Sequence, residues 1–423
     1  MDLLLAAASA CSGKREPFIG QNSCVVAVTM TPAARGDPDR SEKGTRALGQ
    51  GTSDGFDLVV VGAGIVGLGC ALAAARKGKR VVVIDRDAQA NGASVRNFGF
   101  ITVTGQAAGQ MWSLARRSAD LWADVADRAA IPVHHRGMAL AVRRPESVAV
   151  LEAFLKTEMG EGCDWLDPGA LAAVRPELAG ATHLGALRSP HELRVESRLA
   201  IPRLAGWLEQ EHGVTFRRLT AVVGVEPGQV HTTAGTLHAQ AVVVCPGDDL
   251  VNLFPERLAS YGVTRCKLQM MRLASPGYRL AGGVMSDLGL IRYSGYADLP
   301  EAAALKARLL AEQGDHIANG VHLIVVQSAD GSLVVGDSHH YAPTPDPFSH
   351  QSVDSLILDE FARVFGTRPP AILEQWVGTY AYASDHDVII DNPAPGVRLV
   401  TVTTGAGASV GLALGEDVVS DLI

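Results

Sequence analysis

Three glycines and one acidic residue near the start of the chain have the spacing of an anion-binding site. Gly62, Gly64 and Gly67 form the pattern G-x-G-x-x-G, and Asp85 follows the last of them by 18 residues. Gly62 permits a tight turn, Gly64 lets a pyrophosphate approach the backbone, and Gly67 lets a helix pack closely on a strand. A helix N-terminus attracts an anion, and the acid can hold a ribose hydroxyl pair. These residues predict a dinucleotide site.

The elements that position these residues are complete in residues 56–87. The run LVVVG predicts a buried strand, GLGCALAAARKG a helix with small residues on the face that packs on the sheet, and KRVVVID a second strand ending in Asp85. A β-α-β unit with the acid in place favours a bound dinucleotide over a glycine turn without a ligand. This unit alone does not choose between NAD and FAD.

A second glycine-rich turn near the C-terminus favours FAD. Residues 396–423 predict a strand, a turn with Gly405 and Gly407, and a helix that these glycines open. A flavin gains negative charge at its N1–C2=O edge on reduction, so it benefits from a second helix N-terminus, which an NAD enzyme does not need. The alternative reading is a plain helix cap. Residues 237–249 predict one more buried strand, which ends in Cys245-Pro246-Gly247.

The order of these motifs resembles the FAD-dependent amine oxidoreductases of the D-amino-acid oxidase superfamily. The resemblance covers residues 56–423 and is closest to the glycine oxidase, sarcosine oxidase and D-amino-acid dehydrogenase group. More narrowly, ASVRNFGFITVTGQ (93–106), KLQMMR (267–272) and GDSHHYAPTPDPF (336–348) resemble a branch that is found with phosphonate breakdown.

The resemblance implies an α/β fold in which a Rossmann-like FAD-binding domain is interrupted by an α+β substrate domain with a mixed, largely antiparallel sheet. Strands are expected at 136–145, 289–296, 321–328 and 332–341, and helices at 110–130 and 301–316. The expected division is a disordered extension at 1–54, FAD-binding segments at 55–132, 194–264 and 372–423, and substrate-domain segments at 133–193 and 265–371.

The resemblance also implies which residues contact FAD. The loop 91–99 after the second strand is expected to run along the flavin, and the backbone near Val222 or Val223 is expected to meet the adenine. The expected cofactor-binding residues are Gly62, Gly64, Ile65, Val66, Gly67, Asp85, Arg86, Ser94, Asn97, Val222, Gly247, Gly405, Gly407, Ala408 and Ser409. Because no cysteine falls in a segment placed beside the ring, non-covalent binding is favoured, with covalent attachment left open.

The segment QWVGTYAYASD (375–385) departs from the family pattern. The amino-acid oxidases usually read W-x-G-x-R-P there, and the arginine clamps the substrate carboxylate with two parallel hydrogen bonds. Here Trp376 and Gly378 match, but Tyr380 stands at the arginine position and Ala381 at the proline. A neutral phenol cannot balance a buried carboxylate. We therefore expect either a substrate without a carboxylate at that point or an anion held by other residues.

Candidate anion holders are Arg292 with the neighbouring Tyr293 and Tyr296, and Lys267, Arg272, His339 and His340. Only one histidine of the pair can face a pocket, since side chains alternate along a strand. Tyr380 and Tyr382 are expected to share the face that lines the substrate cavity. The residues predicted to act on the substrate are Tyr380, Arg292, His339 and Arg96.

The predicted function is FAD-dependent oxidation of a small amine, with hydride transfer to flavin N5 and hydrolysis of the imine to an aldehyde plus ammonia or an amine. The favoured substrate is an aminophosphonate such as 2-aminoethylphosphonate or its N-methyl form. Alternatives are a D-amino-acid or glycine/sarcosine oxidoreductase with a relocated carboxylate clamp, a non-catalytic FAD-binding subunit, and a nicotinamide dehydrogenase. Oxygen and a quinone or other electron carrier are both open as acceptors, and oligomeric state is open.

Composition limits the other partners. The chain has 423 residues and a formal net charge of −8, which argues against nucleic-acid binding. Residues 1–54 are rich in Gly, Pro and charge, and read as a disordered extension. None of the six cysteines forms a C-x-x-C pair, so no metal site and a reducing, cytoplasmic location are expected. Cys70 and Cys245 are expected to be buried, and no apolar run is long enough to span a membrane.

Overall fold

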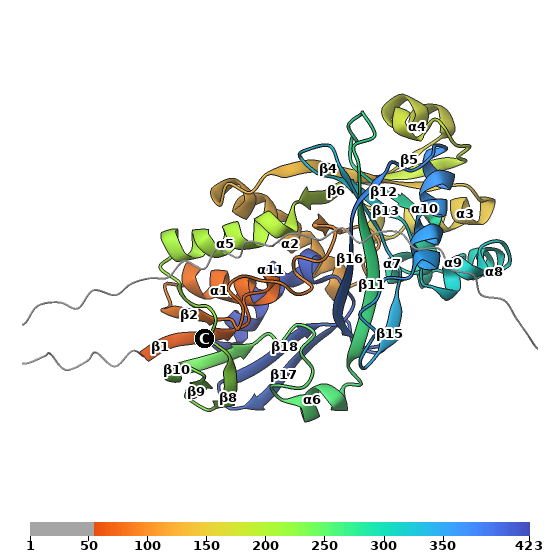
Figure 1. Ribbon diagram of the computed structural model, residues 1–423. Coiled ribbons are helices and arrows are strands. Elements are labelled where there is room, and N and C mark those ends of the chain that lie inside the picture. Colours follow the sequence, from red (N-terminus) through yellow and green to blue (C-terminus); the bar gives the residue numbers. More distant parts are fainter. Residues whose placement is uncertain (1–54) are drawn as a thin grey trace, which may run out of the picture. The chain divides into compact units, whose positions relative to one another are not determined.

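The computed structural model describes residues 55–423. The expected disordered extension, with Cys11 and Cys24, lies outside the described residues. The remainder contains two sheets, and the core of each is continuous with the helices that cover it (Figure 1). The predicted α/β class with a glycine oxidase-like plan of one largely parallel and one largely antiparallel sheet is confirmed.

The first sheet is built around the predicted β-α-β unit. Its strand order is β17-β18-β10-β1-β2-β7. The strands are β1 (Gly55–Val61), β2 (Val81–Ile84), β7 (Thr215–Arg217), β10 (Gly235–Val244), β17 (Val388–Ala394) and β18 (Val397–Val402). The pairs β1–β2, β1–β10, β2–β7 and β10–β18 are parallel. The carboxyl ends of β1, β2, β10 and β18 therefore meet at one edge, which is where open parallel sheets bind ligands.

Both faces of this sheet are buried, which explains why its strands read as continuous apolar runs rather than alternating ones. Leu58 and Val60 of β1 pack under helices α1 (Ile65–Arg76), α2 (Gln110–Arg128), α5 (Ser197–Glu211) and α11 (Gly407–Leu422). Val59 faces the other way, toward strands β8 (Val222–Glu226) and β9 (Gln229–Thr232). Figure 1 shows the helices on one side of β1 and β10 and the β8–β9 pair on the other.

Helices α1 and α11 cross at glycines. A Cβ on Gly69 of α1 would lie 2.4 Å from the carbonyl oxygen of Gly411, and one on Gly415 of α11 would lie 2.3 Å from the carbonyl carbon of Gly69. The two helix backbones are therefore in direct contact. Because of this close crossing, the N-termini of both helices reach the same edge of the sheet.

The second sheet has the order β15-β11-β14-β13-β12-β4-β6-β3, with β16 on β11 and β5 on β6. Its strands are β3 (Phe100–Ile101), β4 (Val133–Val142), β5 (Asp164–Leu166), β6 (Gly185–Val195), β11 (Thr264–Leu273), β12 (Gly283–Ser286), β13 (Ile324–Gln327), β14 (Leu333–Gly336), β15 (His340–Ala342) and β16 (Ile372–Tyr382). All pairs are antiparallel except β12–β4.

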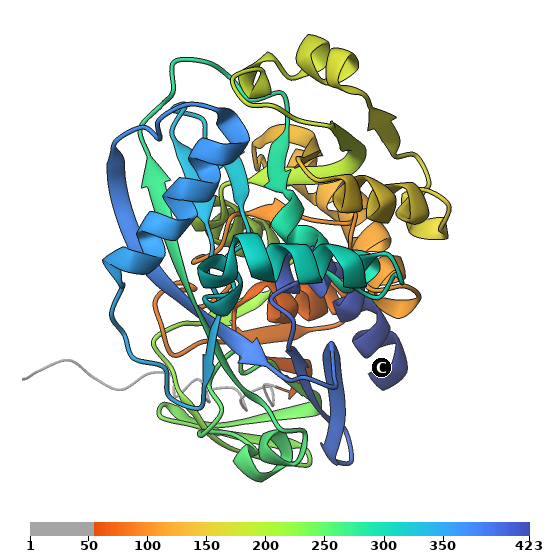
Figure 2. The ribbon, with the colours of Figure 1, turned by 90° about the vertical axis from the view of Figure 1, so that its right-hand side faces the viewer.

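The outer face of this sheet is covered by helices from the middle and late parts of the chain. They are α3 (Pro145–Phe154), α8 (Ala302–Glu312), α9 (Gly314–Ala318) and α10 (Gln351–Phe365). Shorter elements complete the fold: α4 (Pro168–Val174), α6 (Pro255–Ser260), α7 (Ser294–Ala297), and the 3-10 turns η1 (Glu158–Gly160), η2 (Pro176–Leu178) and η3 (Asp287–Ile291). In Figure 2, β11 and β16 run side by side from the second sheet toward the first.

Two element predictions need correction. The run 289–296 is not a strand: it forms the end of η3, a connecting turn and α7. Gly295 lies so close to the loop at Gly105 that a Cβ would be 2.4 Å from the carbonyl oxygen of Gln106, an approach that a strand with side chains could not make. The run 332–341 is two short strands, β14 and β15, separated by Asp337–His339.

Several other predictions agree with the structure. The helix expected at 110–130 is α2, that at 301–316 is α8 followed by α9, and the strands at 136–145 and 321–328 correspond to β4 and β13 with shifted ends. The contact pattern places residues 55–423 in one compact unit, so the finer domain boundaries remain a prediction. Among residues 55–423, none of the helices is both long and apolar enough to cross a bilayer.

Candidate active site

Two adjoining cavities lie at the edge where the first sheet meets β11 and β16. The larger has a volume of about 380 Å³ and the smaller about 170 Å³. Both are lined by Gly64, Ala93, Ser94, Cys245 and Gly247, so these residues mark the junction between them. Together the two cavities form an elongated space of the kind that a dinucleotide can occupy.

The predicted glycine turn is constrained as the motif requires. Gly62 has φ +100°, and a Cβ there would lie 2.4 Å from the carbonyl oxygen of Cys245. A Cβ on Gly67 would lie 2.0 Å from the carbonyl oxygen of Gly62. Neither position can carry a side chain without moving the backbone. At the start of α1, the N–H of Ile65 donates to Ser94 Oγ at 2.9 Å, which ties the loop after β2 to the helix N-terminus.

The smaller cavity contains the predicted ribose and adenine contacts. Asp85, Arg86 and Val222 all line it. The Asp85 carboxylate accepts hydrogen bonds from the N–H groups of Ala63 at 2.7 Å and Asp87 at 2.9 Å. Each oxygen keeps a further lone pair, so the carboxylate can still accept from a hydroxyl. Arg86 forms an ion pair with Asp249 at 2.7 Å.

A second helix N-terminus faces the larger cavity. Gly405, Gly407, Ala408 and Ser409, at the start of α11, line it together with Ile65, Val66 and Gly67 of α1. Gly405 has φ +77°, and its Cβ position lies 3.0 Å from the Tyr380 ring. Two helix N-termini therefore converge on one cavity. This fits FAD, which carries a pyrophosphate at one point and a ring that becomes anionic at another.

The far wall of the larger cavity carries the aromatic and basic residues. Tyr380 and Tyr382 of β16 both line it, as do Arg96 and Asn97 of the loop after β2. Asn97 also holds that loop, because its Oδ1 accepts from the N–H of Gly99 at 2.6 Å and from the hydroxyl of Ser197 at 2.7 Å. The expected cofactor-binding residues and the four residues predicted to act on the substrate all line one of the two cavities.

Arg292 reaches the hydroxyl of Tyr380, the residue that stands at the family's arginine position, from a different element. It follows η3, and its guanidinium donates to the hydroxyls of Tyr341 at 3.1 Å and Tyr380 at 3.4 Å. Burial would lower the pKa of Arg292, but its interactions with Tyr380 and Tyr341 raise the pKa above its ordinary value, so the group is a fixed cation. Burial raises the pKa of Tyr380 well above the usual range, which keeps that phenol neutral.

Other candidate anion holders lie elsewhere. Lys267 is on the opposite side of β11 from the cavity-lining Leu268, and it pairs with Asp346 at 2.9 Å. Arg272 bonds to Glu196, Glu374, Ser328 and Ser332. Both predictions are therefore wrong, because nearer acidic or polar partners hold these side chains outside the cavity.

The aromatic and histidine candidates divide in the same way. Tyr293 and His339 line the cavity. Tyr296 instead is fully buried against the Phe154 ring at 4.6 Å between centroids, and His340 Nε2 lies 3.1 Å from Asn319 Oδ1. The expectation that one histidine of the pair faces the pocket is confirmed. Cys70 is buried as expected, whereas Cys245, which was also expected to be buried, is half-buried and lines both cavities.

The sequence analysis missed two cavity residues, His322 and Asp337. His322 precedes β13 and Asp337 follows β14, and their backbones pair directly, with N–H···O distances of 3.3 and 3.0 Å. Burial raises the pKa of Asp337 to about 8 and lowers the pKa of His322 and of His339 well below the ordinary value. The sequence did contain a signal for these residues, since an aspartate and histidines lie next to apolar runs that read as strands.

The comparisons with known proteins place this chain in a family. The model of the DAO family, described as FAD dependent oxidoreductase, matches residues 57–421. The chain therefore belongs to that family, and it is an FAD-dependent oxidoreductase with FAD as its cofactor. No curated protein matches the sequence.

Solved structures share the fold. Glycine oxidase from Geobacillus kaustophilus is 19% identical, with 87% of this chain and 94% of that chain covered and a TM-score of 0.67. L-proline dehydrogenase from P. horikoshii is 19% identical, with 87% and 93% covered and a TM-score of 0.70. Iminodiacetate oxidase from Chelativorans sp. BNC1 is 19% identical, with 86% and 94% covered and a TM-score of 0.65.

Proposed function

We propose that this protein oxidises a small amine that carries an anionic group, and that the favoured substrate is an aminophosphonate such as 2-aminoethylphosphonate or its N-methyl form. The observation that carries the proposal is the replacement of the family clamp. The β16 position that usually holds an arginine holds the buried Tyr380, and Arg292 reaches its hydroxyl from a separate element.

The donor set suits a phosphonate. A phosphonate has three oxygens and up to two charges, so several convergent donors hold it better than a single fork. Arg292, Tyr341 and Tyr380 form one hydrogen-bonded group in the cavity wall, and Arg96 lines the same cavity. In this account Arg292 binds the anionic group, and the two phenols orient the guanidinium. The apolar side chains of Leu268 and Met270 exclude water beside it.

The residues proposed to hold FAD are those of the two helix N-termini and the smaller cavity. Bound FAD supplies the hydride acceptor, and the imine product hydrolyses in water to an aldehyde plus ammonia or methylamine. The chain supplies position: the substrate is fixed at its anionic end, so that its amine-bearing carbon reaches the ring from a constant direction.

One observation favours a second candidate, a D-amino-acid or glycine/sarcosine oxidoreductase with a relocated clamp. The Arg292 guanidinium is planar, and such a fork can bind a carboxylate with two parallel hydrogen bonds. Its charge lies beside the hydroxyl of Tyr380, the residue that stands at the family's arginine position. The two candidates differ in the anionic group that Arg292 binds. The similar structures whose names refer to amino acids do not decide between them, because at 19% sequence identity they show only a shared fold.

Product analysis tests the choice. The FAD-loaded protein is incubated with 2-aminoethylphosphonate, its N-methyl form, glycine, sarcosine and D-alanine, and products are followed by phosphorus and proton NMR. We expect a phosphonoaldehyde, with ammonia from the first substrate and methylamine from the second. Faster formation of glyoxylate or pyruvate than of the phosphonoaldehyde would reject the aminophosphonate and leave the relocated clamp.

A further inference from the structure

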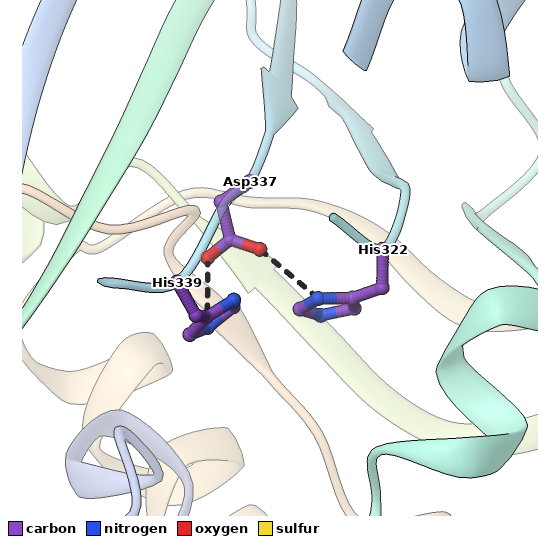
Figure 3. A group of neighbouring side chains, drawn as sticks. All are labelled: His322, Asp337 and His339. Atoms are coloured by element: carbon purple, nitrogen blue, oxygen red, sulfur yellow. Dashed lines mark ion pairs between the residues drawn. The ribbon is translucent and has the colours of Figure 1, made fainter. Parts of the chain in front are cut away.

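His322, Asp337 and His339 form a buried cluster in the wall of the larger cavity (Figure 3). Their exposed fractions are 2%, 4% and 7%. One ligand-type atom of each residue lies within 4.8 Å of those of the other two. We propose that this cluster binds a divalent first-row transition metal ion of the Zn²⁺ type, with His322 Nδ1, the Asp337 carboxylate and His339 Nε2 as ligands.

The tautomers are set by contacts on the far side of each ring. His339 Nδ1 lies 2.9 Å from the carbonyl oxygen of Gly320, an acceptor only, so Nδ1 carries the proton and Nε2 of the neutral ring presents a lone pair. His322 Nε2 lies 3.2 Å from the hydroxyl of Tyr293, which leaves Nδ1 facing Asp337. Metal-binding histidines commonly donate their second nitrogen to a carbonyl in this way, which fixes the ring.

The separations suit a cation larger than a proton. His322 Nδ1 lies 3.3 Å from Asp337 Oδ1, and His339 Nε2 lies 3.7 Å from Asp337 Oδ2. These distances exceed the usual 2.7–3.2 Å of an N–H···O hydrogen bond. Two ligands that are each about 2.1 Å from one zinc ion lie roughly 3 to 3.5 Å apart. Figure 3 shows each carboxylate oxygen of Asp337 directed at one imidazole.

Two polar atoms that face the centre of the cluster lack hydrogen-bond partners. Asp337 Oδ1 and His322 Nδ1 are both buried without a hydrogen bond. Leaving such groups unsatisfied costs free energy, which a shared cation would offset. Arg292 makes no hydrogen bond to the cluster, because its hydrogen bonds go to Tyr341 and Tyr380, and its charge only partly offsets the burial that raises the pKa of Asp337. The donor set of two imidazoles and one carboxylate favours Zn²⁺, Fe²⁺ or a similar ion over Mg²⁺ and Ca²⁺.

The scaffold holds the three ligands on neighbouring strand ends. The backbone pair between His322 and Asp337 fixes two of them, and the N–H of His339 donates to the carbonyl of Asn319 at 3.0 Å. All three residues line the cavity, so the ion would keep a position open to it, as catalytic metal sites do. The sequence analysis expected no metal because it considered cysteine spacing, which does not detect this set.

Zinc titration of the full-length FAD-bound protein tests the proposal. After treatment with a chelator and buffer exchange, the protein is titrated with ZnCl₂ by calorimetry, and bound metal is measured by elemental analysis, with MgCl₂ as the comparison. We expect about one zinc per chain and no comparable magnesium uptake. The zinc titration involves no amine. Zinc binding can therefore be absent from a protein that oxidises amines, and present in one that does not.

We expect zinc binding to weaken by at least about 100-fold in each of three variants, Asp337→Asn, His322→Gln and His339→Gln. Loss of a residue that only hydrogen-bonds to a metal ligand already lowers metal affinity about 10- to 100-fold. His340→Gln is the matched control, because His340 is adjacent in sequence but contacts Asn319 outside the cluster. It should bind zinc as the parent does, and the flavin spectrum reports folding of each variant. Absence of zinc uptake by the parent protein, or equal uptake by Asp337→Asn, overturns the proposal. The titration of the parent protein alone can therefore reject it, even if a variant fails to fold.

Discussion

At the scale of single residues, the proposed function depends on Tyr380 and Arg292. A tyrosine stands where the family usually has an arginine, and Arg292 supplies a positive charge beside it. An arginine on β16 would act from a strand, whereas Arg292 acts from the turn between η3 and α7 and is held by two phenols. The presence of a tyrosine at the clamp position could be read from the sequence. Arg292 could be named from the sequence as a candidate for the missing positive charge. Its contact with Tyr380 could not be predicted, because Arg292 lies in an irregular segment whose sequence reads like a strand.

Arg292→Leu tests this exchange. Loss of a charge-assisted contact worth about 3 kcal/mol should raise the apparent dissociation constant of an anionic amine at least about 100-fold. FAD should remain bound with an unchanged spectrum. The measurement is anaerobic flavin reduction as a function of amine concentration. Arg188→Leu is the control, since Arg188 has a half-exposed side chain paired with Asp164 and does not line either cavity. Equal amine binding by both variants would exclude Arg292 as the anion holder.

At the scale of the elements, the α1–α11 crossing brings both helix N-termini to one cavity. Gly69→Ala places a Cβ 2.4 Å from the carbonyl oxygen of Gly411 and should lower the free energy of unfolding by several kcal/mol. Gly206→Ala is the control, because this helical glycine of α5 has nothing within 4 Å of its Cβ position. It should stabilise the protein by about 0.5 to 1 kcal/mol. Urea denaturation of the two variants measures the difference, and similar effects would refute the close crossing.

The turn that opens α11 makes a related prediction about FAD. Gly405→Ala adds left-handed strain and a contact 3.0 Å from the Tyr380 ring, so we expect FAD to bind about tenfold or more weakly. Gly262→Ala has a similar positive φ, +65°, but open space around its Cβ position. That control should lose about 1 kcal/mol of stability and retain FAD affinity. Fluorescence titration of the apoprotein with FAD compares them. Unchanged affinity in Gly405→Ala would separate this turn from the cofactor.

The elements also show where sequence patterns suffice. The β-α-β unit, β10, β18 and α11 were predictable because buried parallel strands and glycine-opened helices have strong local signatures. The structure of segment 289–296 was not predictable, because Gly295 packs closely on the backbone of the loop at Gly105, and such a long-range contact leaves no local sequence pattern. The same limit applies to Lys267 and Arg272. Only the tertiary structure brings their partners Asp346 and Glu374 close enough to take them away from the cavity.

At the scale of the whole molecule, we expect FAD, bound at the edge where the two sheets meet, to stabilise the entire fold. A ligand at about 1,000 times its dissociation constant adds about 4 kcal/mol to the free energy of unfolding. For a chain of this length that corresponds to a rise in melting temperature of about 5 °C or more. Calorimetry of the apoprotein with and without FAD measures the rise, and NAD at the same concentration should cause no change. A melting temperature that NAD raises as much as FAD would contradict the cofactor assignment to these cavities.

The visible spectrum of the FAD-bound protein gives the sharpest test of the proposal that this oxidoreductase acts on an aminophosphonate. The protein is titrated without air with 2-aminoethylphosphonate, with its N-methyl form and with glycine. We expect the phosphonates to bleach the flavin at concentrations at which glycine leaves it oxidised, because Tyr380 stands at the position of the family's carboxylate clamp and Arg292 lies among several donors. Bleaching by glycine at equal or lower concentrations would contradict the account and assign Arg292 to a carboxylate.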